Sequence, residues 1–328
     1  MPVNSQCWKI YALGGGLGHL HRSLALSRAA IARGHRVDVL ANSPLAPHLP
    51  WREELGTRGC ATMIPSSASP SETSTAVSDW LHTGDCDRLV VDTFPRGLAG
   101  ELPALLLSVT VPTVLVHRDL NPDYVEQFQL AKAVNRFDLI LVPGEDAPFA
   151  RAAHAQSTDP WLIRDSTELL TPCWAREALG VETGDDRPVL VVCSTSSERE
   201  ERFFHELAAS LTDRLDSWIV RTASPVPASA QLTTWPLLRL LPGVNGLVGG
   251  GGYNLVHEAR STDTPLFAFA LPRRYDRQAI RLAQHERVRG SREIIARLGE
   301  IRKSLDNPSY PNGVHQAANL IEQSARRS

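Results

Sequence analysis

The 328-residue sequence lacks a surplus of charge of either sign, because 34 lysines and arginines stand against 36 aspartates and glutamates (34 − 36 = −2). No basic surface for neutralising phosphate backbones is expected, which argues against nucleic acid as a partner. Long hydrophobic runs are also missing. The longest apolar stretch, 102–116, is broken by prolines and hydroxyl residues and is shorter than the roughly 20 residues that cross a bilayer. We expect no transmembrane segment, and peripheral membrane contact stays open.

Cysteine patterns and export signals are scarce as well. The five cysteines are odd in number and scattered, and no CxxC pair occurs, so neither a disulfide framework nor a zinc pattern is indicated. The first residues, MPVNSQ, do not form a basic segment followed by an apolar core, as a signal peptide would. We therefore expect reduced thiols and a cytoplasmic protein.

Apolar runs of strand length alternate along the chain with segments of helical periodicity, which predicts an α/β fold with parallel sheets covered by helices. The pattern is lost over 143–172, which contains several prolines, and then resumes. The length favours two domains. We predict an N-terminal Rossmann-like domain over 1–150, a linker over 151–185 and a C-terminal Rossmann-like domain over 186–328. The final helix can pack back on the first domain.

The expected strands are 7–13, 36–41, 61–64, 88–92, 113–117, 139–142, 188–193, 217–220, 237–241 and 266–271. The expected helices are 19–33, 72–82, 98–107, 123–136, 198–214, 253–261, 291–305 and 314–327.

The segment 246–278 combines several functional signals. Gly249 to Gly252 connect an apolar strand to a helix capped by Asn254, and glycine permits backbone angles that side chains forbid. Bare N–H groups beside the positive end of a helix dipole bind phosphate. Glu258 lies one turn into the helix, where a carboxylate can accept two hydrogen bonds from a ribose diol. A polar cluster, 273–278, follows the next strand.

This order and spacing resembles the donor-nucleotide motif of GT-B glycosyltransferases, notably the family 28 N-acetylglucosaminyltransferases that make the lipid-linked peptidoglycan precursor. The resemblance implies two facing Rossmann-like domains with a cleft between them. It implies that a nucleoside-diphosphate sugar, most simply a UDP sugar, is held through its diphosphate by Gly250, Gly251, Gly252, Tyr253 and Asn254. In the same way it assigns the ribose to Glu258 and the donor sugar to Asp276, Arg277 and Gln278.

Two further places in the second domain are expected to contact the donor. Ser194 and Thr195 follow the first strand of the second domain, at the position of a family donor loop. The glycines usual in that loop are absent here. Arg221 follows the expected strand 217–220 and is a candidate for the diphosphate or the base.

A first glycine turn, Gly14 to Gly18, ends in His19. No third glycine follows Gly16 and Gly18 with dinucleotide spacing, and the second strand ends in Asn42 rather than an acid, which argues against NAD or FAD. In the resembled families a histidine at this point lies near the acceptor. Imidazole titrates near neutral pH and suits a general base that deprotonates an acceptor hydroxyl.

Other residues are expected on the acceptor side. Asp119 is the candidate for orienting His19, and alternatively it forms an ordinary ion pair in its loop with Arg118. The predicted acceptor contacts are Gly16, Gly18, Arg22, His117 and Arg118. The form G-x-G-H-x-x-R at 16–22 is also similar to the nucleotide-sugar hydrolase of pseudaminic acid synthesis, in which water attacks the donor.

Neither a metal nor a cofactor is expected. Asp85 and Asp87 match in form the metal-binding pair of a different glycosyltransferase fold, but they precede a strand and so lie at an amino end. His19 and His21 lack a third ligand nearby in sequence. The resemblance implies that helix ends and protein cations stabilise the leaving diphosphate instead.

The sequence therefore predicts an inverting, metal-independent glycosyltransferase that moves a sugar from a nucleotide to an unidentified small-molecule or glycan acceptor. Three alternatives stay open: a nucleotide-sugar hydrolase of the same fold, a non-catalytic nucleotide-binding relative, and an NAD enzyme.

Overall fold

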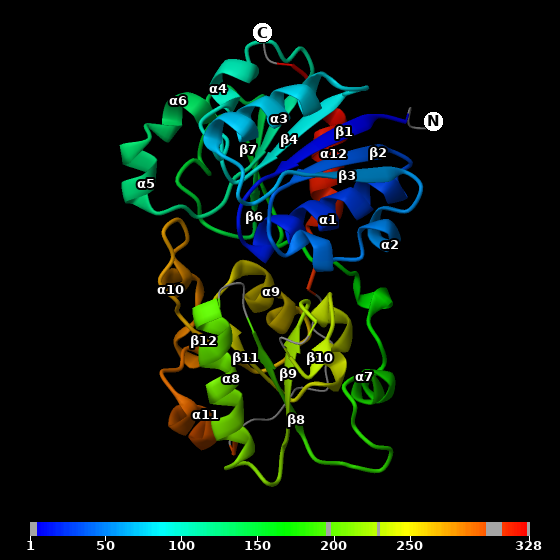
Figure 1. Cartoon of the computed structure of the whole chain (residues 1–328), viewed down its shortest axis with the longest axis vertical. Helices are drawn as coiled ribbons and strands as arrows, with labels where there is room; N and C mark the ends of the chain where they lie inside the picture. The colour runs from blue at the N-terminus through cyan, green and yellow to red at the C-terminus, as the bar shows by residue number, and fades with distance from the viewer. Residues whose placement is uncertain (1–4, 195–197, 228–229, 300–309, 327–328) are drawn as a thin grey trace. The chain divides into compact units, whose positions relative to one another are not determined.

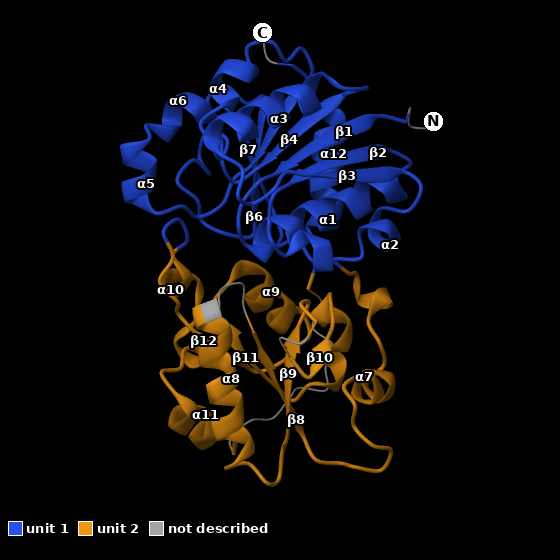
Figure 2. Ribbon diagram, in the orientation of Figure 1, with its two compact units in different colours: residues 1–163, 274–276, 311–328 blue, residues 164–273, 277–310 orange. Residues whose placement is uncertain are grey.

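The computed structural model describes residues 5–194, 198–227, 230–299 and 310–326. The chain forms two compact units (Figure 2). Unit 1 contains Met1–Ile163, Arg274–Asp276 and Pro311–Ser328, and unit 2 contains Arg164–Arg273 and Arg277–Tyr310. The chain first leaves unit 1 after Ile163, inside the segment 151–185 that the sequence indicated as a linker, and its last segment returns to unit 1.

Unit 1 is built on a seven-stranded parallel sheet in the order β3-β2-β1-β4-β5-β6-β7 (Figure 1). The strands are β1 Cys7–Ala12, β2 Arg36–Ala41, β3 Gly59–Met63, β4 Arg88–Asp92, β5 Thr113–Val116, β6 Leu139–Pro143 and β7 Ala155–Thr158. The order reverses between β1 and β4. In an open parallel sheet, ligands bind beyond the carboxyl ends of the strands at such a reversal.

Helices cover both faces of this sheet, because alternate strand residues are apolar on both sides. The helices are α1 Leu17–Ala32, α2 Trp51–Leu55, α3 Pro70–His82, α4 Leu102–Leu105, α5 Pro122–Gln127, α6 Leu130–Val134 and α12 Val314–Gln323. One core joins strand side chains such as Tyr11 and Val91 to Trp80 of α3 and Val134 of α6. On α1, Gly34 follows the helix with φ +93° and donates its N–H to the Ile31 carbonyl, as a C-terminal glycine does.

Unit 2 carries a five-stranded parallel sheet in the order β10-β9-β8-β11-β12. Its strands are β8 Val189–Cys193, β9 Ile219–Ser224, β10 Leu232–Thr233, β11 Gly246–Gly250 and β12 Leu266–Phe269. The order reverses between β8 and β11. Its helices are α7 Pro172–Ala178, α8 Glu198–Thr212, α9 Tyr253–Ser261, α10 Gln278–Arg281 and α11 Ser291–Leu298. Phe204 and Leu211 of α8 pack with Ile294 of α11 against the sheet.

Several expected elements differ in the structure, including the strand expected at 217–220, which is β9 and covers Ile219–Ser224. The strand expected at 237–241 is a 3₁₀ helix, Leu237–Gly243, flanked by Pro236 and containing Pro242, neither of which has an N–H for a strand ladder. The helix expected at 123–136 is split into α5 and α6 by Gln129, whose φ is +46°. The helix expected at 98–107 is reduced to the four residues of α4. Strands β7 and β10 and helices α2, α7 and α10 were not anticipated.

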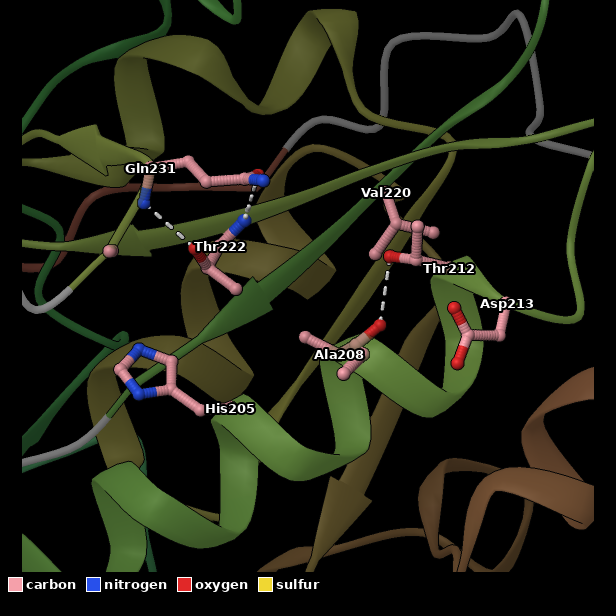
Figure 3. A pocket seen from close by; sticks show the side chains of 9 residues that line it. His205, Ala208, Thr212, Asp213, Val220, Thr222 and Gln231 are labelled. Carbon is pink, nitrogen blue, oxygen red and sulfur yellow. Dashed lines mark hydrogen bonds between the residues drawn. The ribbon is translucent and has the colours of Figure 1, made fainter.

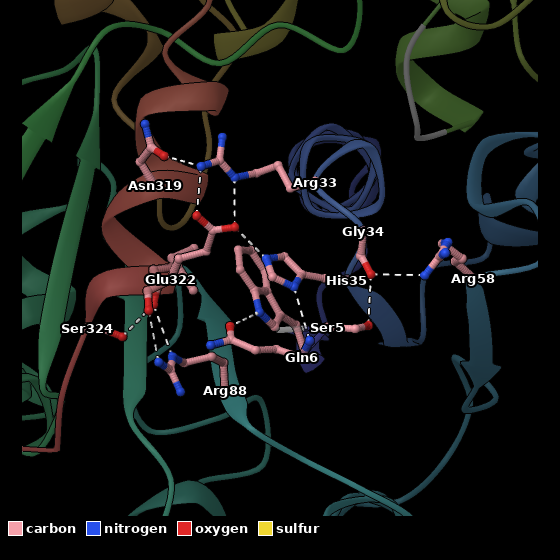
Figure 4. A network of polar contacts seen from close by, with 12 residues as sticks. Ser5, Gln6, Arg33, Gly34, His35, Arg58, Arg88, Asn319, Glu322 and Ser324 are labelled. Carbon is pink, nitrogen blue, oxygen red and sulfur yellow. Dashed lines mark hydrogen bonds and ion pairs between the residues drawn. The ribbon is translucent and has the colours of Figure 1, made fainter. Parts of the chain in front are cut away.

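The C-terminal helix α12 belongs to unit 1 and packs against α1. Glu322 accepts two hydrogen bonds from Arg33 (2.7 and 2.9 Å) and lies 2.6 Å from Nε2 of His35 (Figure 4). His35 is fully buried, stacks on Trp8 at 4.9 Å and accepts a hydrogen bond at Nδ1 from the Gln6 amide. The end of the chain is therefore tied to its first helix and first strand.

Candidate functional site

The loop after β1 holds His19 in a fixed place at the carboxyl end of the unit 1 sheet. Gly14 has φ +156°, and a Cβ built on it would lie 2.3 Å from Cδ2 of His19, so the imidazole occupies the space of the missing side chain. The Gly14 amide donates to Oδ1 of Asn42 (2.7 Å), at the end of the neighbouring strand β2. Gly16 caps α1, which puts Gly18 and His19 in its first turn. Asn42, which argued against a dinucleotide fold, here anchors the glycine turn.

His19 is paired with a carboxylate. Its Nδ1 lies 2.5 Å from Oδ2 of Asp92, the last residue of β4, and its ring stacks on Phe94 with 5.2 Å between centroids. The His19 side chain keeps 15% exposure, and Nε2 has no hydrogen-bond partner in the described parts of the chain. A neutral imidazole in this arrangement carries its proton on Nδ1 and has its lone pair on Nε2.

Arg22 binds the same carboxylate from the next turn of α1. Its Nε donates to Oδ1 of Asp92 (2.9 Å) and its Nη2 donates to Oδ2 (2.7 Å). Burial raises the pKa of Asp92, but the charge of Arg22 and the hydrogen bond from His19 outweigh it and hold this pKa well below its usual range. Asp92 is therefore ionised at neutral pH. Thr93 follows with φ +67°, which is strained for a β-branched residue, and its hydroxyl donates to Asp92 (3.1 Å).

The partner of His19 is Asp92 and not Asp119, so the expectation for Asp119 was wrong on this point. Sequence reasoning treated Asp92 only as the end of a buried strand. Its neighbour in the sheet is β1, and the carboxyl ends of adjacent parallel strands meet at one edge. The signal that could have identified Asp92 is an acidic residue at the end of a strand that neighbours the strand before the glycine turn. Asp119 itself is buried (8% exposed).

His117 and Arg118 follow β5 and are also buried. Arg118 forms an ion pair with Glu145 (2.9 Å), an acid that the sequence analysis did not consider. His117 has no exposed surface, and neither of its ring nitrogens has a hydrogen-bond partner among the described residues. Burial, together with the charge of Arg118, lowers the pKa of His117 to about 4. Buried to this extent, His117 and Arg118 contribute structure first, and their contact with an acceptor stays a prediction.

The glycine turn of unit 2 lies where the sequence predicted, but close packing, and not unusual backbone angles, requires its glycines. It follows β11 at the reversal between β8 and β11 and leads into α9, whose N-cap is Gly252 rather than Asn254. None of its four glycines has a positive φ. Instead, a Cβ would lie 2.5 Å from Leu255 at Gly249 and 2.8 Å from Leu282 at Gly251. At Gly252 nothing lies within 4 Å, so the space in front of the helix start is open.

Polar groups surround this helix start. Oγ of Ser194 and Oδ1 of Asn254 are buried without a hydrogen-bond partner in the described part of the chain, which is unusual in a folded protein and typical of a ligand site. Glu258 is 4% exposed on α9. Burial and then the charge of Glu258 raise the pKa of the Cys193 thiol at the end of β8. Thr195 lies outside the described residues.

The polar cluster after β12 divides between the units. Asp276 belongs to unit 1, while Arg277 and Gln278 belong to unit 2, where Arg277 caps α10. Gln278 is buried, accepts a hydrogen bond from the Leu271 amide (3.1 Å), and would meet a Cβ on Gly251 at 3.2 Å. Gln278 therefore lies directly against the glycine turn. At the start of α9, the ring of Tyr253 packs on His257 (4.4 Å).

Arg221 does not follow a strand, as the sequence suggested, but lies inside β9 opposite Val191. Its guanidinium donates to the carbonyls of Leu179 (3.2 Å) and Gly180 (3.1 Å) at the end of α7. Cations are favourable at helix carboxyl ends, and we assign Arg221 to this structural contact instead of the donor diphosphate.

The two acids that match a metal-binding pair in form, Asp85 and Asp87, have other partners in the structure. Asp85 pairs with Arg36 (2.8 Å), and Asp87 accepts a hydrogen bond from the Cys7 amide (2.7 Å), so both have structural contacts at the amino end of the sheet. The described residues contain no group of three His, Cys, Asp or Glu side chains suited to a metal ion. Among those residues, no helix has the length and apolar character needed to cross a membrane.

Unit 2 also contains a pocket of about 520 Å³ between α8 and β9 (Figure 3). Its polar lining includes His205, Asp213, Thr222 and Gln231, and the Gln231 amide donates to the Thr222 hydroxyl (2.8 Å). None of the expected donor residues lines it. The candidate functional residues therefore lie in two separate places, the His19 environment of unit 1 and the glycine turn of unit 2, and not in this pocket.

No protein-family model and no curated protein matches the sequence. Solved structures do match. The glycotransferase of kitacinnamycin is 17% identical and aligns over 98% of this chain and 100% of its own, with a TM-score of 0.65. The glycosyltransferase SnogD from Streptomyces nogalater is 16% identical over 98% and 94%, with a TM-score of 0.54. The glycosyltransferase VinC, solved in complex with DTDP, is 13% identical over 97% and 96%, with a TM-score of 0.50. Identities this low establish the fold alone, and the chain has the GT-B fold of these glycosyltransferases.

Proposed function

We propose that the protein is a glycosyltransferase that uses a nucleoside-diphosphate sugar and deprotonates its acceptor with His19. The observation that carries the proposal is the hydrogen bond between Nδ1 of His19 and the ionised Asp92, which leaves Nε2 without a partner in the described chain. A ring nitrogen so prepared can take a proton from a hydroxyl, and this is the chemistry that a sugar acceptor requires.

The geometry of unit 1 supports a role for each of three residues. As the acceptor oxygen attacks the anomeric carbon, its proton passes to Nε2 of His19, and the oxygen–carbon bond forms while the bond to the diphosphate breaks. Asp92 stabilises the imidazolium that results and keeps its orientation. Arg22 holds Asp92 in place and keeps it ionised.

Unit 2 supplies the donor side. The N–H groups at the start of α9 and the open space at Gly252 suit the diphosphate, and the unpartnered atoms of Ser194 and Asn254 lie beside them. Glu258 takes the ribose diol, and Gln278, against Gly251, takes the sugar together with Arg277. Asp276 belongs to unit 1, and its contact with the sugar stays a prediction from the resemblance. In this scheme the helix start, and not a metal ion or cofactor, stabilises the leaving diphosphate.

Finer features belong to the same proposal. A single base and direct attack predict inversion at the anomeric carbon. UDP is the first candidate nucleotide from the sequence resemblance to family 28, and TDP is the second, because VinC holds DTDP. Since Arg22 of the G-x-G-H-x-x-R turn matches the hydrolase of pseudaminic acid synthesis, attack by water in place of an acceptor is the competing function.

The donor side is tested by thermal shift of the whole chain with UDP, TDP, GDP and NAD. A ligand that binds only the folded state raises the unfolding midpoint, so one of the diphosphates should raise it and NAD should not. Glu258→Gln should weaken binding of that nucleotide about tenfold or more, since a charge-assisted hydrogen bond is lost. Glu177→Gln, on an exposed part of α7, is the matched control. Unchanged affinity in Glu258→Gln would remove the ribose role.

The base is tested through nucleotide release from a sugar donor, with and without a cell extract as the source of acceptors. His19→Ala and Asp92→Asn should each lower turnover by roughly 10²–10⁴-fold while nucleotide affinity stays nearly intact. Asp119→Asn is the control, because Asp119 is not the partner of His19. Full activity in His19→Ala would refute the mechanism. Equal release with and without extract, with free sugar as product, would replace the transferase by the hydrolase.

A further inference from the structure

Unit 1 carries a cluster of aromatic rings directly beside His19. The aromatic cluster consists of Phe94, Tyr124, Phe128 and Tyr275. Phe94 stacks on His19, and its ring centroid lies 5.3 Å from that of Tyr275 and 6.3 Å from that of Tyr124. Tyr124 contacts Tyr275 at 4.7 Å and Phe128 at 4.9 Å. An unbroken series of ring contacts therefore leads away from the proposed base.

The outer rings of this cluster are only partly covered by the protein. Phe94 is 4% exposed and forms the base of the cluster, whereas Tyr124, Phe128 and Tyr275 are half-buried and keep accessible surface. Tyr275 is fixed by its main chain, since its carbonyl accepts a hydrogen bond from the Asn121 amide (2.9 Å). Aromatic rings that are fixed in place and keep accessible surface can stack against a planar ligand.

Two guanidinium groups flank the aromatic cluster. Arg96 lies over the ring of Phe128 (5.4 Å to the centroid) and Arg274 lies over the ring of Tyr275 (5.1 Å). Within the described residues neither arginine forms an ion pair with a carboxylate. Burial and then the charge of Tyr275 raise the pKa of Tyr124, while the charges of Arg96 and Arg274 act to lower it.

We propose that the aromatic cluster binds the acceptor of the transfer, and that this acceptor is a planar aromatic hydroxy acid whose carboxylate pairs with Arg96 and Arg274. This inference rests on the proposed function for the role of His19. The rings select a flat aromatic body, and two unpaired cations select a negative charge. Arg274 lies over Tyr275, which contacts Phe94, and Arg96 lies over Phe128, which Tyr124 links to Phe94. Because Phe94 therefore stands between His19 and both of these rings, the hydroxyl and the carboxylate should stand at opposite ends of the ligand, as in 4-hydroxybenzoate or 4-hydroxycinnamate.

The test measures binding to the full chain by calorimetry, with and without UDP. The probes are 4-hydroxybenzoate and 4-hydroxycinnamate, their neutral methyl esters, and the non-aromatic trans-4-hydroxycyclohexanecarboxylate. The acids should bind about tenfold or more tightly than their esters, as expected for a charge-assisted contact, and the non-aromatic acid should bind more weakly than both aromatic acids.

Substitutions then test whether Arg96 and Arg274 cause the preference for acids over esters. The double substitution Arg96→Gln with Arg274→Gln should abolish the preference for acid over ester and leave ester affinity nearly unchanged. Arg52→Gln, at an exposed arginine of α2, should keep the preference, and an unchanged unfolding midpoint shows that the variants are folded. Tyr275→Ala should weaken acids and esters alike.

The outcomes separate this inference from the proposed function. Esters binding as tightly as acids, a preference that survives the double substitution, or no binding of any probe would overturn the assigned acceptor class even if a sugar nucleotide is consumed. Selective binding of the acids without any nucleotide release in their presence would keep the ligand site and refute the transferase.

Discussion

Asp92 accepts hydrogen bonds from His19 and from Arg22 on its two oxygens, and the second contact has a chemical consequence. A carboxylate that also carries an arginine stays ionised and cannot take the imidazole proton. The proton of neutral His19 therefore remains on Nδ1, and Nε2 stays available as the acceptor. In this way Arg22, expected in the sequence as an acceptor contact, determines the tautomer of the base.

His117 gives a prediction on pH. Its folded pKa of about 4 lies below the ordinary value of 6.5, so between these pH values the unfolded chain binds a proton that the folded chain does not. The corresponding stability is full above pH 6.5 and is lost as the pH falls toward 4. We expect this residue to account for about 2 kcal/mol of the stability lost between pH 7 and pH 5.

The measurement is urea unfolding at pH 7 and pH 5 for the natural chain and for His117→Leu. The variant should lose about 2 kcal/mol less between the two pH values, since its side chain cannot be protonated. His48→Leu, at an exposed histidine, controls for general effects of the substitution. An equal loss in the natural chain and in His117→Leu would contradict the prediction.

In the turn between β11 and α9, one glycine is needed for packing and the next one for the proposed ligand. A Cβ at Gly251 would lie 2.8 Å from Leu282 and 3.2 Å from Gln278, so Gly251→Ala must displace packed side chains and should lower the free energy of unfolding by about 1–3 kcal/mol. Gly252 has φ −67° and free space around it, so Gly252→Ala should fold normally. Its methyl group would then stand where we propose the diphosphate binds.

Chemical unfolding and nucleotide calorimetry on both variants distinguish the two effects. Gly252→Ala should show unchanged stability and a nucleotide affinity reduced at least tenfold. Gly251→Ala should show reduced stability whether or not the variant binds the nucleotide. Full nucleotide affinity in Gly252→Ala would mean that the diphosphate does not approach this helix start.

For the molecule as a whole, the last residues of the chain stabilise the first unit. Glu322 is the partner of Arg33 and of the fully buried His35, and α12 buries Ala317 and Ile321 (Figure 4). Replacing Glu322 leaves the buried His35 and the partly exposed Arg33 without this acceptor, so Glu322→Ala should lower the free energy of unfolding by about 2–3 kcal/mol. Arg33 is the largest cause that holds the pKa of Glu322 below its usual value, in keeping with this pairing.

The measurement is chemical unfolding of the full chain. Glu206→Ala, at an exposed glutamate of α8, is the matched control and should change stability by less than about 0.5 kcal/mol. If the loss belongs to unit 1 alone, nucleotide affinity, which we place in unit 2, should not change. A Glu322→Ala protein as stable as the control would show that the network in Figure 4 adds little.

The sequence by itself determined the local features. Alternating strands and helices predicted the α/β class, and the bounds of β2 and β4 agree with the expected ranges because buried apolar runs and turn residues are local signals. The same holds for both glycine turns and for the position of His19 at the end of the first one. The GT-B fold expected from the glycine turn and Glu258 is confirmed by the solved structures.

Only the tertiary structure decided which residues meet. Asp92 is 73 residues from His19 in sequence and becomes its neighbour because β4 pairs with β1. Asp119, the acid that the sequence suggested, follows β5 one strand further away. Arg221 and the glycines of the second turn likewise took their roles from packing, against the end of α7 and against Leu255 and Leu282. Such contacts depend on strand order and on side-chain volume across distant segments, and neither is encoded in the spacing of residues along the chain.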